Sequence, residues 1–337
     1  MKKTLLALGV AALCSGVQAQ SSVQLMGTVD SFVGSIRNPG SARATVVNSG
    51  GMTTSWWGMK GTEDLGGGLK AGFALTGFFQ ADSGANTRLI PGDTFFSRDA
   101  SVNLSGGFGT VTLGRALAPN FLPTILSNPF GDSFTFAPLV LHAAVPVFPA
   151  VGAPWIGTNP ADTGWSNQIM YTTPSFGGLS ANINYQFGEI ANSSGTNNIG
   201  FNVLYFGGPL TLTGFYEDAE VANPTGGALA VAKKNWMVGG AYDFGPVKAF
   251  LTYGQAETAA VDWKTTSLGA SIPVGAGKVL LGYADTDVDA GADRKTFSVG
   301  YDYFLSKRTD VYAMYLHDKI DVLGSGSRFG VGIRHRF

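Results

Sequence analysis

Hydrophobic and polar residues alternate along most of the chain. In LSANINYQF, residues 179–187, apolar and aromatic side chains take every second position, and Ser, Asn and Gln take the positions between them. KTFSVGYDYF, VKAFLTYG and PLTLTGFYE repeat this pattern. A period of two predicts β-strands with two different faces. Sixteen such segments are predicted, beginning near residues 22, 52, 68, 95, 108, 164, 179, 197, 209, 233, 247, 263, 276, 294, 309 and 326.

The connections between these segments alternate in length. Short turns fall near residues 63–67, 106–107, 174–178, 207–208, 244–246, 273–276 and 305–308. Longer polar or Gly-rich loops lie between them, as at 37–51, 81–94, 218–232 and 285–293. An even number of strands, with short turns at one end and long loops at the other, is typical of an outer-membrane β-barrel.

A secreted, soluble β-sandwich or lectin-like barrel would also alternate. Its outer face should be polar, however, whereas here one face of the segments is apolar throughout and tyrosines recur near the strand ends. The last segment, RFGVGIRHRF, ends on Phe337. A terminal strand that ends in Phe resembles the signal read by the outer-membrane barrel assembly machinery. The sequence therefore favours an all-β transmembrane barrel.

One stretch looks at first like a membrane-spanning helix. Residues 133–161 contain no Asp, Glu, Lys or Arg. The stretch also contains five prolines, which remove backbone donors and clash with the preceding turn, so a helix here would break about every second turn. We therefore expect irregular chain. The prolines are Pro138, Pro146, Pro149, Pro154 and Pro160.

The first residues have the form of a secretory signal peptide. Lys2 and Lys3 precede an apolar stretch, Thr4 to Gly16, which is too short to span a bilayer, and Val17-Gln18-Ala19 is a cleavage site. We expect residues 1–19 to be removed and residues 20–337 to form a single barrel domain. Cys14 leaves with the signal, which excludes disulfides and thiol chemistry in the exported protein.

Composition excludes several classes of partner. Without Lys2 and Lys3 the chain has 20 basic residues against 23 acidic ones, so nothing predicts a nucleic-acid partner. No cofactor or metal site is expected: the glycine-rich turns are not followed by helices, and the acidic stretch 285–295 lacks the spacing of an EF-hand.

Several longer motifs indicate a protein family as well as a fold. They are MKGTEDLGGGLKAGF at 59–73, LSGGFGTVTLGR at 104–115, YTTPSFGGLSANINY at 171–185 and FLSKRTDVYAMY at 304–315. Together they resemble the Gram-negative general porins of the β-proteobacterial branch, over essentially the whole mature chain. The resemblance implies a 16-stranded antiparallel barrel in the cell outer membrane, assembled as a homotrimer. It also implies that the third long loop, about residues 117–164, folds inward and narrows a water-filled pore.

In the family this constriction opposes loop acids to wall arginines, and the residues can be carried over one by one. Arg98 matches one wall arginine, and Arg115 matches a basic position before the loop. Two further arginines expected from the family are absent, because Trp56 and Gly164, beside Trp165, stand in their places. The sequence thus predicts a constriction with fewer cations than usual.

The inward loop, about residues 117–164, also carries little charge. Its only charges are Asp132 and Asp162, and it carries six aromatic residues: Phe121, Phe130, Phe134, Phe136, Phe148 and Trp155. Two interpretations remain open. The aromatic side chains either narrow an apolar constriction, or they pack the loop against the barrel wall and never contact solute.

The register around Arg98 is ambiguous. Simple alternation places Arg98 on the same face as Ala100, Val102 and Leu104. Either this apolar set faces the lumen under the loop, or a bulge shifts the register.

The sequence favours passive diffusion of small hydrophilic solutes and ions. An outer-membrane enzyme would need a base and an orienting group at one rim, but His142, His317 and His335 are far apart in strand order. An adhesin or purely structural barrel would not conduct. We therefore expect a channel rather than an enzyme, with outer-membrane lipid and small solutes as its other partners.

Overall fold

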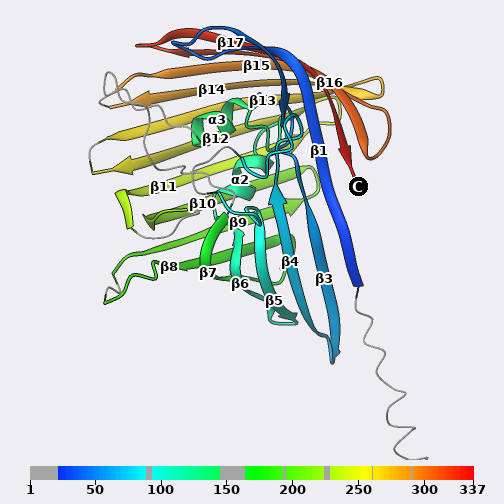
Figure 1. Cartoon of the computed structure of the whole chain (residues 1–337), viewed down its shortest axis with the longest axis vertical. Coiled ribbons are helices and arrows are strands. Elements are labelled where there is room, and N and C mark those ends of the chain that lie inside the picture. Colours follow the sequence, from blue (N-terminus) through cyan, green and yellow to red (C-terminus); the bar gives the residue numbers. More distant parts are fainter. Residues whose placement is uncertain are drawn as a thin grey trace, which may run out of the picture.

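The computed structural model describes residues 22–88, 93–144, 164–192, 195–223, 228–259, 261–289 and 291–337. The predicted signal peptide, Asp162 and the second half of the inward loop lie outside these residues. Most of the described chain is antiparallel β-sheet, wound into a closed barrel with two short helices between the strand walls (Figure 1). Within the described ranges, no helix is both long and apolar enough to cross a membrane.

The sheet contains seventeen strands, each paired antiparallel with its neighbours. They are β1 (Ser22–Arg37), β2 (Ala44–Ser49), β3 (Trp56–Gly66), β4 (Leu69–Phe78), β5 (Asp99–Gly106), β6 (Gly109–Leu117), β7 (Gly164–Thr172), β8 (Leu179–Phe187), β9 (Asn197–Gly207), β10 (Leu210–Val221), β11 (Ala228–Asp243), β12 (Lys248–Thr258), β13 (Asp262–Val274), β14 (Gly277–Val288), β15 (Arg294–Phe304), β16 (Thr309–Ile320) and β17 (Gly324–Arg336).

Strand β1 closes the barrel. One edge pairs with β17 from Thr28↔Arg336 to Arg37↔Ser327. The other edge pairs first with β3, over residues 22–28, and then with β2, over residues 31–36. Strands β2 and β3 therefore share one strand position, interrupted at residues 50–55. The barrel has the sixteen positions predicted from the sequence, and this prediction is confirmed.

The two faces of the wall differ as the alternation predicted. Exposed large apolar side chains recur at every second position, for example Val102 and Leu104 on β5 and Val331 and Ile333 on β17, and they form the outer surface. The positions between them face inward. At the short-turn end of the barrel, Phe337 exchanges two backbone hydrogen bonds with Gly27, and its ring is exposed. Its role as an assembly signal remains a prediction.

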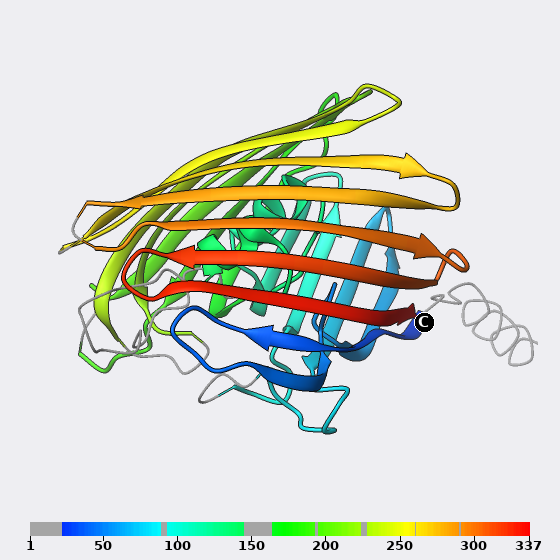
Figure 2. The same cartoon turned by 90° about the horizontal axis from the view of Figure 1, so that it is seen from above.

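The long loop after β6 folds into the barrel, as the resemblance implied. Its described part contains α2 (Phe121–Leu126) and α3 (Pro138–Ala144), which lie against the inner side of the wall formed by β9–β15 (Figures 1 and 2). The expectation of irregular chain was wrong for residues 138–144. Pro138 takes the first position of α3, where its missing N–H has no intrahelical partner to lose.

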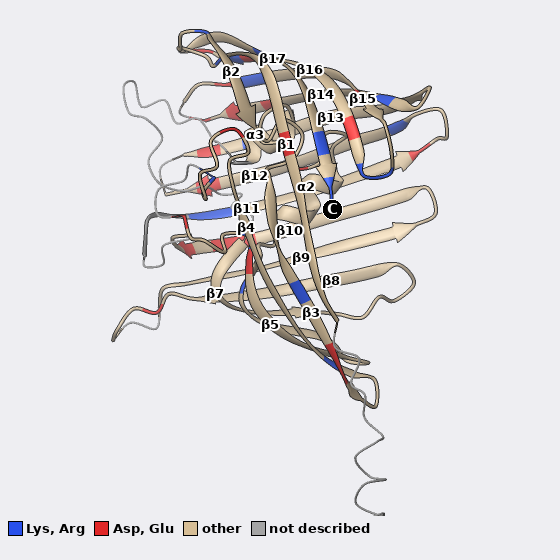
Figure 3. Cartoon of the chain, turned by 45° about the vertical axis from the view of Figure 1, so that its right-hand side comes forward, with Lys and Arg blue, Asp and Glu red and all other residues tan. Residues whose placement is uncertain are grey.

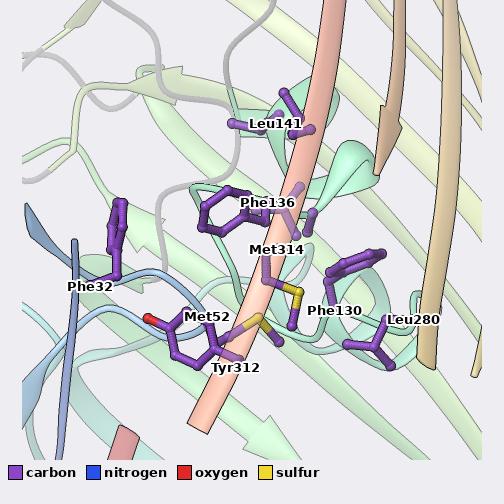
Figure 4. Packing of buried hydrophobic residues seen from close by; sticks show 11 residues of the cluster. Phe32, Met52, Phe130, Phe136, Leu141, Leu280, Tyr312 and Met314 are labelled. Atoms are coloured by element: carbon purple, nitrogen blue, oxygen red, sulfur yellow. The ribbon is translucent and has the colours of Figure 1, made fainter. Parts of the chain in front are cut away.

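The inward loop brings a hydrophobic core into the barrel. Phe130 and Phe136 are at most 1% exposed, and they pack with side chains from β1, β14 and β16 (Figure 4). The rings of Phe32 and Phe136 meet edge to face at 5.6 Å between centroids. The core also contains Met52, Ala137, Val140, Leu141, Leu280, Tyr312, Met314 and Leu316. Phe130 and Phe136, with Phe134 packed against the same cluster, therefore pack the inward loop against the wall.

Two glycines on the inner face of the wall make room for this core. A Cβ at Gly282 would lie 2.9 Å from the Phe130 ring and 3.1 Å from Pro138, and one at Gly330 would lie 3.0 Å from Phe136. Real Cβ atoms do not approach ring carbons so closely. The absence of a side chain at these positions therefore sets how near the loop lies to the wall.

Gly282→Val should displace the inward loop. We expect it to destabilise loop docking by ~1–3 kcal/mol, the usual cost of overpacking, and to lower the temperature at which the barrel unfolds in detergent while changing single-channel conductance. Gly214→Val is the matched control, because that glycine points outward and an added Cβ there meets only ordinary contacts, the nearest at 3.4 Å. Equal effects from the two variants would contradict the packing role of Gly282.

Candidate functional site

The interruption between β2 and β3 is organised by one buried carboxylate, Asp30 on β1. The carboxylate accepts hydrogen bonds from the amides of Gly51 (3.0 Å), Met52 (2.8 Å) and Thr53 (2.9 Å), and from the Tyr312 hydroxyl. The Asp30 carbonyl accepts from the amide of Gly50. Four consecutive amides thus converge on a single residue: Gly50 on its carbonyl, and Gly51, Met52 and Thr53 on its carboxylate in place of a strand partner.

The same interruption holds the inward loop. The hydroxyl of Ser133 donates to the Gly51 carbonyl at 2.6 Å, and that of Thr135 donates to the Gly50 carbonyl at 2.8 Å. Residues 50–53 are therefore fixed to the wall by Asp30 on one side and carry the loop on the other. This places the loop at a defined depth in the barrel.

Thr53 links a loop acid to a wall base. Its hydroxyl donates to Asp132 at 2.9 Å and accepts from the Arg334 guanidinium at 2.9 Å. Burial raises the pKa of the Asp132 carboxyl, whereas the Thr53 hydrogen bond and the positive charges of Arg334 and Arg98 act in the opposite direction. Asp132 therefore lies within the electrostatic reach of arginines from two parts of the wall.

Arg334 belongs to a row of charges on four neighbouring strands, with cations on the two outer strands and carboxylates on the two between them, which we call the charged ladder. Lys278 on β14 stands opposite Asp302 on β15, and Asp310 on β16 stands opposite Arg334 on β17. The guanidinium of Arg334 bonds to Asp310 at 3.0 Å and lies 3.5 Å from Asp302, and Arg336 bonds to Asp310 at 2.8 Å. Figure 3 shows these charges gathered on the strands near the C-terminus. Each arginine of the ladder thus has a carboxylate partner.

On the other side of Asp132, Arg98 lies just before β5. It pairs with Asp99 at 2.9 Å, and its guanidinium stacks on the Trp56 ring at 4.0 Å from the centroid, an arrangement that stabilises the cation. Neither interpretation of the Arg98 register is correct. The apolar set on β5 faces outward, and the pairing with β4 runs from Thr76↔Asp99 without a bulge. Arg98 stands at a bend before the strand begins, which brings its side chain to the inward-facing Trp56.

Arg115 occupies a different position from Arg98. It lies at a register shift between β6 and β7, is only 5% exposed, and donates to the carbonyls of Ser97 and Gly164 and to the Ser166 hydroxyl. It therefore ties the end of the inward loop to the chain before β5. Trp165 is also buried, and a Cβ at Gly200 would lie 3.1 Å from its ring.

The wall formed by β7, β8 and β9 contains no charged residue. Most of its buried polar side chains are amides: Gln168, Asn184, Gln186 and Asn198 are buried and hydrogen-bonded to one another in two pairs. The amides of Gln168, Asn184 and Asn202 also donate to the carbonyls of Ala116, Leu117 and Pro119. This uncharged wall fixes the entry of the inward loop.

The comparisons with known proteins agree with this architecture. The model of the Gram-negative porin family matches residues 4–322. Outer membrane porin protein 32 of Delftia acidovorans is 37% identical over 93% of this chain and 88% of its own length. The solved anion-selective porin from Comamonas acidovorans is 30% identical, with a TM-score of 0.77 over 94% of this chain and all of that one. OmpT of Vibrio cholerae in its trimer form, with 15% identity and a TM-score of 0.67 over 94% of this chain and 99% of its own, shares the fold.

The chain belongs to the Gram-negative porin family. It is an integral β-barrel of the outer membrane and forms a porin channel. Porins are channels rather than enzymes. Of the described residues, no three His, Cys, Asp or Glu side chains are grouped to hold a metal ion.

Sequence reasoning missed the contributions of Thr53, Arg334 and Arg336 to this porin. The alternation in RFGVGIRHRF does place Arg334 and Arg336 on the inward face, so the signal for them was present. No comparable signal marks Thr53, whose position depends on Asp30, more than 20 residues away in the sequence.

His142 on α3 anchors the far side of the loop. It is 2% exposed, and its ring nitrogens lie 2.7 Å from the hydroxyls of Thr286 and Thr296. Thr296 must donate its proton to Asp318, because a carboxylate only accepts. Thr296 therefore accepts from Nε2–H, and Nδ1 accepts from Thr286. Burial and the nearby Arg294 cation lower the pKa of His142 well below its ordinary value of 6.5, so the ring is neutral at pH 7.

Acid should weaken the docking of the loop through His142. Because the docked ring has a lowered pKa, its contribution to docking is complete above pH 6.5 and falls as the pH drops towards that lowered pKa. We expect the ring resonances of His142 in an NMR titration to remain those of neutral imidazole at pH 6. The exposed His317 and His335 are references in the same sample. His142→Gln should reduce the increase in channel noise between pH 7.5 and pH 5. A His142 ring that is protonated at pH 6 would contradict the assignment.

Proposed function

We propose that this porin admits small hydrophilic solutes and ions through a constriction whose charges are largely balanced. The constriction comprises Thr53 and Asp132 at its centre, Trp56, Arg98 and Asp99 on one side, and the charged ladder with Asp30 on the other. Its four cations are Arg98, Arg334, Arg336 and Lys278, and its five carboxylates are Asp30, Asp99, Asp132, Asp302 and Asp310. The observation that carries the proposal is that each arginine of this group is paired with a carboxylate in place.

Balanced charge predicts weak selectivity between anions and cations. A pore selects ions through the field of the side chains at its narrowest ring, and that field falls when opposite charges lie a few ångströms apart. The anion-selective relative from Comamonas acidovorans shares 30% identity with this chain. In this porin, Trp56 and Gly164 take the places where the family resemblance implied further arginines. We propose weaker anion selectivity and easier passage of neutral or aromatic solutes.

The remaining expectations belong to the same proposal. Arg115, Gly164 and Trp165 would shape the constriction indirectly, by holding the ends of the inward loop, and Asp162 would add an acid to it. The protein would assemble as a homotrimer, as recorded for the OmpT structure. Its apolar outer surface would contact outer-membrane lipid, and Phe337 would be read by the barrel assembly machinery.

Asp302→Asn should make the channel more anion-selective. The change removes a negative charge beside Arg334 and opposite Lys278, leaving an excess of positive charge. We expect the anion-to-cation permeability ratio, from reversal potentials across planar bilayers in a KCl gradient, to rise on the order of twofold at about 0.1 M salt and less at 1 M. Asp289→Asn, at the exposed loop after β14, is the matched control and should leave the ratio unchanged. An unchanged ratio in Asp302→Asn, or strong anion selectivity of the unmodified protein at low salt, would contradict the balanced constriction.

Trp56→Arg restores a cation at a position where the resemblance implied one. It removes the stacking surface under Arg98 and adds a second guanidinium beside it, so the permeability ratio should shift toward anions. Trp56→Phe keeps an aromatic ring without adding charge and should leave the reversal potential unchanged. If Trp56→Arg also left it unchanged, Trp56 would not contact the permeation path.

A further inference from the structure

One arginine on the inner face of the barrel lies apart from the constriction. Arg328 is on β17, six residues before Arg334 and with the same inward orientation. At about 3.3 Å per residue, this places it roughly 20 Å closer to the end of the barrel that carries the long loops, the long-loop end. Because that end faces the outside of the cell, Arg328 belongs to the outer vestibule of the pore.

The Arg328 guanidinium is held by neutral groups. Its Nε and Nη2 donate to the side-chain oxygen of Asn38 at 3.2 and 2.9 Å, and its Nη1 donates to the Thr135 carbonyl at 2.9 Å. Within the described part of the chain, no carboxylate lies within ion-pairing distance of it. A guanidinium has five N–H donors, and these contacts use three of them. Its charge and part of its hydrogen-bonding capacity are therefore available to a solute.

The acid on the neighbouring strand is already occupied. Asp318 on β16 accepts from Nε and Nη2 of Arg294, at 3.0 and 2.8 Å, and from the Thr296 hydroxyl. Arg294 is 5% exposed and Lys233, on the inner face of β11, is 3% exposed, whereas Arg328 is partly exposed. Among the described cations of this vestibule, Arg328 thus combines exposure with a charge that no carboxylate offsets.

Apolar side chains border the Arg328 guanidinium. Ile36 of β1 stands directly opposite Arg328 in the β1–β17 pair, and Phe134 of the inward loop immediately precedes Thr135, to which Arg328 donates. Ile36, Phe134 and Val46 of β2 pack against the hydrophobic core of the loop, and each remains partly exposed. A cation therefore lies beside an apolar surface that faces the pore rather than the lipid.

A small organic anion with an apolar body matches both features. A carboxylate accepts from two parallel N–H groups of a guanidinium, and apolar carbon gains free energy in proportion to the area that it removes from water. Chloride uses only the charge of such a site. A neutral aromatic solute uses only the apolar surface.

We propose that Arg328, Ile36, Val46 and Phe134 form an entry subsite for small apolar carboxylates, of which benzoate is the simplest aromatic example. Arg328 binds the carboxylate, and the three apolar side chains contact the ring. The subsite rests on the proposed passage of small solutes through this porin and extends that passage to one chemical class. Binding is weak because the site is open to the vestibule, which permits release toward the constriction.

The test measures the excess current noise that a solute adds to single channels of the full-length protein at about 0.1 M KCl, where charges are moderately screened. Benzoate is compared with acetate, which lacks the ring, and with benzamide, which lacks the charge. We expect benzoate to have the lowest half-saturating concentration of the three. Arg328→Gln should raise that concentration about fivefold and leave benzamide unaffected. Arg37→Gln, an equal change of charge on the outward face of β1, is the matched control and should bind benzoate normally.

The apolar half of the subsite has its own variant. Val46→Thr keeps the β-branched shape but replaces a methyl group by a hydroxyl, so it should weaken benzoate about twofold and leave acetate unchanged. Arg328→Lys keeps the charge without the planar fork of N–H groups and should restore part of the affinity that Arg328→Gln loses.

Each outcome bears on the subsite. Normal benzoate binding in Arg328→Gln, or equal half-saturating concentrations of benzoate and acetate in the unmodified protein, would overturn the proposal. If Arg328→Gln alters the conductance in KCl alone, the inward loop has moved, and Val46→Thr then decides: an unaltered ratio of benzoate to acetate binding rules the subsite out. Failure of the subsite leaves the KCl conductance of the unmodified protein intact, whereas failure of the proposed channel function abolishes that conductance.

Discussion

The backbone of a chain that crosses hydrocarbon must satisfy its own hydrogen bonds, and the rest of this porin depends on that constraint. Closing the sheet meets it almost everywhere, because β1 pairs with β17 on one edge and with β2 and β3 on the other. Strand pairing does not satisfy the backbone at residues 50–55, where the second strand position is interrupted. There the Asp30 carboxylate and carbonyl together accept from four successive amides. At three of these four amides, one side chain therefore takes the place of a strand neighbour.

The interruption in turn determines where the inward loop is held. It carries Thr53 to the point where its hydroxyl joins Asp132 to Arg334, and it presents the carbonyls that receive Ser133 and Thr135. A continuous strand would have no free carbonyls for the loop. The hydrophobic core around Phe130 and Phe136 stabilises the docked loop, but hydrophobic burial is non-directional and does not fix the position of the loop. The hydrogen bonds of Ser133 and Thr135 do fix it. The wall thus sets how deep the loop lies in the barrel, and with it the contact of Asp132 with Thr53.

The sequence predicted the barrel well because its signal is local. The period of two, the turn residues and the length of each connection can be read within ten residues, and the predicted starts at 164, 179, 197, 294 and 309 coincide with those of β7, β8, β9, β15 and β16. The site was less accessible because it depends on pairs distant in sequence, such as Asp30 with Thr53 and Arg334 with Asp302. Family resemblance pointed to Arg98, but its contact with Trp56 arises from a bend that no alternation pattern could show.

The contrast between paired and unpaired arginines separates the charged ladder from the outer surface of the wall. Inside, each arginine of the charged ladder is held by a carboxylate on a neighbouring strand, so its field is short-ranged and its geometry is fixed. On the outer surface at the long-loop end, the described groups to which Arg37 and Arg43 donate are neutral serine groups, which orient a guanidinium without cancelling its charge. A carboxylate partner offsets the charge of a guanidinium, whereas a neutral partner does not. Among the described residues, the arginines of the charged ladder are thus paired with carboxylates on the inner face of the barrel, and Arg37 and Arg43 with neutral groups on the outer face.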